Sequence, residues 1–140
     1  MNVLIDTNVA IDVMLKREPF FENSQLVLLA SEQKHINGFV SASAITDIFY
    51  ITNKALKDKE STSELLKKHL IKAINIAAVD GESIYKALDA EWSDFEDCVQ
   101  YFVGESIPAD YIVTRNPEDF ANAKITIVTP ERLLDIIAPE

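Results

Sequence analysis

Short apolar runs alternate with longer amphipathic segments from one end of this chain to the other. This alternation constrains the fold most, because strands separated by helices pair in parallel and a parallel sheet needs helices on both faces. We therefore predict one α/β domain over residues 1–140, a three-layer α/β/α sandwich around a mostly parallel five-stranded sheet. The predicted strands are Val3–Ile5, Ile36–Val40, Ile74–Val79, Tyr111–Thr114 and Ile125–Val128.

The segments around these strands have the apolar spacing of helices. The last helix has the clearest start, because Thr129 suits the N-cap and Pro130 suits the first helical position. Asp80-Gly81-Glu82 and Asn116-Pro117-Glu118-Asp119 are typical of turns that lead into helices. The predicted helices are Val9–Lys16, Asn23–Lys34, Ser43–Leu56, Ser61–Ala73, Glu82–Ala90, Phe95–Glu105 and Pro130–Ile137.

Composition narrows the class of protein. An apolar content of 48% indicates a compact globule rather than a disordered chain. Asp6 and Asp12 interrupt the N-terminal apolar stretch too early for a signal peptide, and Phe39–Ile51 is too short and too polar to cross a bilayer. The single cysteine, Cys98, fits a reducing compartment, so we expect a cytoplasmic protein with no membrane partner.

Isolated carboxylates are the strongest functional signal. Asp6 is the only charged side chain among the first eleven residues, and Asp47 is the only one between Lys34 and Lys54. A carboxylate in an apolar segment is costly to desolvate, so it usually has a partner or a chemical role. The alternative is structural: Asp6 caps the first helix, and Asp47 is a buried acid bonded to a backbone or hydroxyl group.

A third group of acids begins the predicted helix at Phe95. Asp94 and Asp97 are three residues apart and share a face, and we expect Glu96 to point elsewhere. Acids in a first helical turn also favour the helix dipole, so capping by Ser93 or Asp94 is the competing interpretation.

The predicted topology brings some of these residues to one edge of the sheet. Asp6 follows the first strand, and Asn116 and Asp119 follow the fourth; sites in open parallel sheets form beyond the carboxyl ends of the strands. Converging acids repel one another and need a cation. Carboxylates without His or Cys suit Mg²⁺ or Mn²⁺ rather than zinc. We interpret His35 and His69 as surface residues and Cys98 as core packing.

Four motifs occur in order along the chain: Leu4-Ile5-Asp6-Thr7-Asn8-Val9, Ile45-Thr46-Asp47-Ile48, Asp94-Phe95-Glu96-Asp97 and Ile112-Val113-Thr114-Arg115-Asn116 with Asp119-Phe120. Together with the closing residues Val128-Thr129-Pro130-Glu131, they cover nearly the whole chain. These motifs resemble the PIN-domain nucleases, most closely the small stand-alone bacterial and archaeal proteins that include VapC-type toxins.

The resemblance implies a metal-dependent endoribonuclease that hydrolyses single-stranded RNA with Mg²⁺ or Mn²⁺. It implies that Asp6, Asp47 and Asp97 bind the metal. The resemblance gives as further catalytic candidates Asp94, which only part of the family has, and either Asn116 or Asp119. We expect Thr7, Asn8 and Thr114 to orient the carboxylates or bind phosphate, and Arg115 to contact phosphate. Arg115 can instead pair with a site carboxylate.

The sequence departs from the family pattern at two positions. Asp47 stands where the family often has Glu, so its reach is shorter by one methylene, and Asn116 contributes no charge. The net charge of −10 also opposes capture of a polyanion. The lysine clusters Lys54, Lys57 and Lys59 and Lys67, Lys68 and Lys72 offer local positive charge, or are simply solvated helix faces.

The acids are also compatible with other functions. A haloacid-dehalogenase-like enzyme needs a second Asp where this chain has Asn8, and a receiver domain needs an acidic pair and a late Lys that are not well placed. A non-catalytic interaction module on the same fold is the stronger alternative. The helix containing Phe49 and Tyr50 and the pair Phe20-Phe21 suit a homodimer or an antitoxin partner.

Overall fold

A computed structural model describes residues 1–139, and their five strands form one sheet in which all pairs are parallel. The strand order is β3-β2-β1-β4-β5, so the first strand lies at the centre. This confirms the predicted five-stranded sheet. The strands are β1 (Asn2–Ile5), β2 (Asn37–Ser41), β3 (Asn75–Ala77), β4 (Tyr111–Val113) and β5 (Thr126–Val128).

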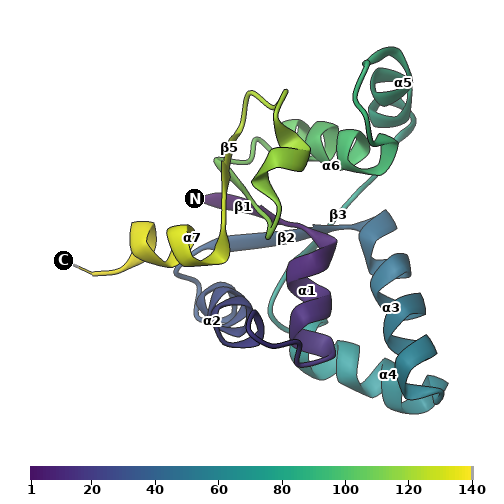
Figure 1. Ribbon diagram of the computed structural model, residues 1–140, viewed down its shortest axis with the longest axis vertical. Coiled ribbons are helices and arrows are strands. Elements are labelled where there is room, and N and C mark those ends of the chain that lie inside the picture. Colours follow the sequence, from purple (N-terminus) through teal and green to yellow (C-terminus); the bar gives the residue numbers. More distant parts are fainter. Residues whose placement is uncertain (140) are drawn as a thin grey trace.

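Helices cover both faces of the sheet, as the α/β/α prediction requires (Figure 1). One layer contains α1 (Thr7–Met14), α2 (Phe21–Glu32), α3 (Ala42–Leu56), α4 (Lys59–Leu66) and α7 (Pro130–Ile137). The opposite layer contains α5 (Gly81–Asp89), α6 (Phe95–Ser106) and the short 3₁₀ helix η2 (Pro117–Phe120). No helix in the described part of the chain is long and apolar enough to cross a membrane.

The alternating side chains of the strands divide the core in two. Val3 and Ile5 of β1 pack under α1, α2 and α3, whereas Leu4 packs with α6 on the other face. β4 repeats the pattern, with Val113 in the first cluster and Ile112 in the second. Both faces of the sheet are therefore buried, which explains why the strands are continuous apolar runs in the sequence.

The predicted helix Ser61–Ala73 is wrong in its boundaries and its regularity. It begins earlier, because Asp58 accepts a hydrogen bond from the backbone N–H of Glu60 at 3.1 Å and caps α4. After Leu66 the helix widens into a π-helical turn, η1 (Lys67–Ile71). The N-cap predicted at Thr129 is confirmed, since its hydroxyl accepts from the N–H of Arg132 at 3.2 Å.

The strand order creates a switch point between β1 and β4. From β1 the chain winds outward through β2 and β3, and it then crosses to the other side of β1 to form β4 and β5. The β1–β4 pairing continues one residue past β1, where the N–H of Asp6 donates to the carbonyl of Val113 at 3.0 Å. A parallel sheet has its ligand crevice at such a point.

A candidate acidic active site

Asp6 lies at the switch point and is held from three directions. Its Oδ1 accepts hydrogen bonds from the backbone N–H of Thr7 and from Nε2 of Gln100, and its Oδ2 accepts from Thr114 Oγ1 at 2.8 Å. Burial raises the pKa of Asp6, and the hydrogen bonds from Thr114, Thr7 and Gln100 oppose that rise. Asp6 is also the N-cap of α1, so the capping interpretation and the site interpretation both apply.

Thr114 and Asn8 brace the loops on each side of Asp6. The buried hydroxyl of Thr114 accepts from Asn8 Nδ2 at 3.3 Å and from the N–H of Asn116 at 3.1 Å. The Oδ1 of Asn8 accepts from the backbone N–H of Arg115 at 3.2 Å. These bonds join the end of β1 to the end of β4, so Thr114 and Asn8 orient the carboxylate.

An acidic hollow of about 200 Å³ opens beside Asp6. Four further carboxyl groups line it, two of them from the first turn of α6 and one from its N-cap. Thr7, Asn8, Ile11, Arg17 and Gln100 complete the lining, so Arg17 is the only cation at its wall within residues 1–139. The acids at the wall are Asp6, Asp94, Glu96, Asp97 and Asp119.

Asp97 has a strongly raised pKa at this wall. Burial, together with the smaller effect of the charges of Asp6, Asp94 and Asp119, raises the pKa of Asp97 to about 7. A carboxyl group with this pKa is poised to exchange a proton for a cation near neutral pH. The structure therefore brings Asp6, Asp94, Asp97 and Asp119 into one electrostatic group, although their sequence positions span more than a hundred residues.

The expectation that Glu96 points away from the other acids is wrong. Glu96 lines the hollow, and a hydrogen bond with the Asp47 side chain, followed by partial burial, raises the pKa of Glu96 to about 7. Asp47 lies on α3 and is half-buried, and its side chain interacts with Glu96, which joins it to the acids at the hollow. Spacing along α6 could not reveal this contact, because Asp47 belongs to a different helix, α3.

Asp94 and Asn116 have local structural roles as well. The carboxylate of Asp94 accepts from the N–H of Asp97 at 2.9 Å, so Asp94 is the N-cap of α6 and also lines the hollow. Asn116 is the N-cap position of η2 and does not line the hollow, whereas Asp119 does. The buried ring of Phe120 anchors η2 and so fixes Asp119 beside α6.

Arg115 pairs with a carboxylate outside the predicted set. Its Nε lies 2.7 Å from Oδ2 of Asp12, which is fully buried, and its guanidinium lies 4.1 Å from the ring centre of Phe20. Desolvation raises the pKa of Asp12, and the charges of Arg115 and Arg17 lower it. Arg115 is therefore committed to holding α1 against the β4 loop, and Arg17 is the guanidinium that borders the acids.

The donor set fits a hard divalent cation. The hollow offers carboxylate, hydroxyl and amide oxygens, with neither His nor Cys among its wall residues. No three Asp, Glu, His or Cys side chains within residues 1–139 are placed to bind one ion together. Mg²⁺ does not require such a cage, because proteins usually hold it through one or two carboxylates while it keeps several waters.

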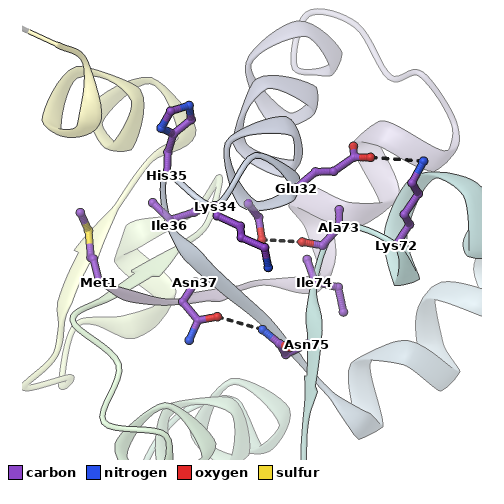
Figure 2. A pocket seen from close by; sticks show the side chains of 11 residues that line it. Met1, Glu32, Lys34, His35, Ile36, Asn37, Lys72, Ala73, Ile74 and Asn75 are labelled. Atoms are coloured by element: carbon purple, nitrogen blue, oxygen red, sulfur yellow. Dashed lines mark hydrogen bonds and ion pairs between the residues drawn. The ribbon is translucent and has the colours of Figure 1, made fainter.

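A second hollow, of about 290 Å³, lies at the opposite edge of the sheet, where the strands begin (Figure 2). There Asn75 Nδ2 donates to Asn37 Oδ1 at 2.9 Å, and Asn37 Nδ2 donates to Asn2 Oδ1 at 3.0 Å. Lys72 pairs with Glu32 at 3.5 Å. This amide ladder ties three strands together, and its side chains offer no nucleophile or acid cluster.

Comparison with known proteins gives the same family as the motifs. A family model described as a PIN domain matches residues 2–118. No curated protein matches the chain.

Solved structures share the fold at low sequence identity. A chain of VapBC2 from Rickettsia felis, crystallised with a promoter DNA fragment, is 16% identical with a TM-score of 0.68, over 91% of this chain and 97% of that one. VapC20 from Mycobacterium tuberculosis, described as a toxin that cleaves the sarcin-ricin loop, is 10% identical with a TM-score of 0.67, over 86% and 94%. A toxin–antitoxin complex from Klebsiella pneumoniae contains a chain that is 22% identical, with a TM-score of 0.65, over 91% and 97%.

Proposed function

The chain belongs to the PIN domain family, and we propose that it is a metal-dependent endoribonuclease that hydrolyses single-stranded RNA in the cytoplasm. One observation carries the proposal: within residues 1–139, five carboxyl groups share a wall with a single guanidinium, at the switch point of a parallel sheet. The folded protein keeps these acids close together although they repel one another, and a bound divalent ion would neutralise that repulsion. A non-catalytic module has no need for such a cluster.

We assign the ion, Mg²⁺ or Mn²⁺, to Asp6 and Asp97, with Asp47 acting from α3 together with Glu96. When bound, the ion supplies activation of a water molecule and neutralisation of charge on the phosphodiester. Thr114, Thr7 and Gln100 keep the Asp6 carboxylate fixed through hydrogen bonds.

The remaining wall residues suit a phosphate-containing substrate. Arg17 borders the acids and supplies positive charge for a backbone phosphate. This local charge offsets the repulsion between RNA and a protein whose net charge is −10. Asp119, on η2, lines the hollow, and its charge helps to raise the pKa of Asp97. We therefore prefer Asp119 to Asn116 as the fourth acidic position.

The test is cleavage of defined single-stranded RNAs by the purified full chain, with Mg²⁺ or Mn²⁺ and then with excess chelator. We expect cleavage that requires the metal and that Asp97→Asn abolishes, because the amide keeps the shape of the carboxyl group but removes its charge. Asp135→Asn, an exposed carboxyl on α7, is the matched control and should keep full activity. Cleavage that survives both the chelator and Asp97→Asn would refute the proposal.

A role as the toxin of a toxin–antitoxin pair is the finer form of this proposal. Its support is the likeness to the Klebsiella pneumoniae complex, together with the exposed apolar side chains Tyr50 and Leu56 on α3, which suit an antitoxin or a second copy of the chain. A short neighbouring reading frame whose product suppresses growth arrest by this protein is the expected result. Unimpaired growth on expression of the active nuclease alone would contradict the toxin role.

A further inference from the structure

Gln100 is a buried polar residue at the acidic hollow that the family motifs did not single out. Its side chain is 2% exposed, and it lies one turn after Glu96 and Asp97 on the same face of α6. A buried amide has to find partners for two donors and an acceptor, so its environment shows what it serves.

One half of the Gln100 amide is satisfied by Asp6. Its Nε2 donates to Oδ1 of Asp6, a bond between helix α6 and the end of β1. The orientation of the amide follows from chemistry, because the reverse placement would set two acceptor oxygens against each other. Hydrogen bonds to a charged acceptor are the stronger kind, so this contact fixes the direction in which Asp6 presents its carboxylate.

The other half of the amide has no protein partner. Oε1 of Gln100 is buried and accepts no hydrogen bond from any group in the described part of the chain. Thr7 Oγ1, also at the hollow's wall, is buried and similarly without a partner there. Unsatisfied buried oxygens beside an acid cluster indicate a ligand with donors, such as water held by a cation.

We propose that Gln100 is a positioning residue of the cation site. Its Nε2 holds the Asp6 carboxylate toward the hollow, and its Oε1 accepts a hydrogen bond from the water shell of the bound ion. This inference rests on the proposed function, since it assigns a role toward the same ion. It adds to the site a neutral residue of α6 that the sequence motifs did not identify.

The test is Mn²⁺ binding to the metal-free full chain, measured as free Mn²⁺ by electron paramagnetic resonance at fixed pH and salt. Gln100→Met keeps the volume and removes both polar contacts, and we expect Mn²⁺ affinity to fall by about 10- to 100-fold, as when other outer-shell partners are removed. Gln33→Met, an exposed position at the end of α2, is the control and should stay within about twofold of the parent protein.

A second variant guards against a folding defect. Gln100→Asn keeps an amide but shortens its reach by one methylene, and it should lose affinity in the same way. Thermal melting of each metal-free variant separates the roles, because a purely structural glutamine would lower the melting temperature and leave Mn²⁺ affinity unchanged. That result would overturn the role of Gln100 and leave the nuclease proposal intact. Absence of Mn²⁺ binding by the parent protein would overturn both.

Discussion

Replacing Arg115 by Met should destabilise the protein strongly, although Arg115 does not line the acidic hollow. The substitution keeps an apolar stem but leaves Asp12, fully buried, without the guanidinium that lies 2.7 Å from its Oδ2. Removing one partner of a buried ion pair costs about 3–5 kcal/mol. The side chain of Arg115 is 23% exposed and Arg17 also acts on Asp12, so we expect the lower end, about 3 kcal/mol.

That free energy corresponds to a measurable change in melting temperature. With an unfolding entropy of about 2.1 cal/mol/K per residue, a 140-residue domain loses about 10 °C for 3 kcal/mol. Urea denaturation followed by circular dichroism gives the free energy of unfolding directly. Arg132→Met, an exposed arginine on α7, is the matched control and should change it by less than about 0.5 kcal/mol.

Two further measurements test the reasoning. The double variant Asp12→Asn/Arg115→Met should be more stable than Arg115→Met alone, because no charge is then buried without a partner. The defect of Arg115→Met should also shrink at acid pH. Desolvation raises the pKa of Asp12 in the folded state, so the folded protein takes up a proton at Asp12 more readily than the unfolded chain. As the pH falls, Asp12 becomes neutral, and the cost of burying its unpaired charge in the variant disappears. A loss below about 1 kcal/mol, or a double variant no more stable than the single one, would refute the argument.

Two other outcomes follow from the site and the sheet. In the folded protein the pKa of Asp97 and that of Glu96 rise from ordinary values of 3.8 and 4.5 to about 7. Between those values the folded protein binds more protons than the unfolded chain, so the stability of the metal-free protein should fall as the pH rises from 5 to 8. Scanning calorimetry should show this fall and its reversal by Mn²⁺ at pH 8; a flat profile would contradict it. Gly38→Ala should cost about 1–3 kcal/mol in urea denaturation, because the added Cβ would lie 2.9 Å from Cβ of Ser31, whose hydroxyl bonds both the Gly38 N–H and the Ala73 carbonyl. A neutral effect would mean that Ser31 moves aside freely.

Local patterns in the sequence were sufficient for the architecture. Apolar runs such as Val3–Ile5 are strands in the structure because both faces of the parallel sheet are buried, and the Thr129-Pro130 pair starts the last helix where capping chemistry requires. The position of Asp6 just after the first strand, and of Asp119 after the fourth, also predicts from the sequence that both residues lie at one edge of the sheet.

Which partner each charge takes was decided by the tertiary structure. Arg115 is bound to Asp12, Arg17 borders the acids, Glu96 meets Asp47, and Gln100 holds Asp6. Each contact joins different elements of the fold, and helical or strand periodicity carries information only about neighbours within one element. The sequence alone therefore determined the sheet, its two buried faces and the edge where the acids gather. The ion pairs, the orphaned oxygens and the raised pKa values depend on distances between side chains that only the packed chain defines.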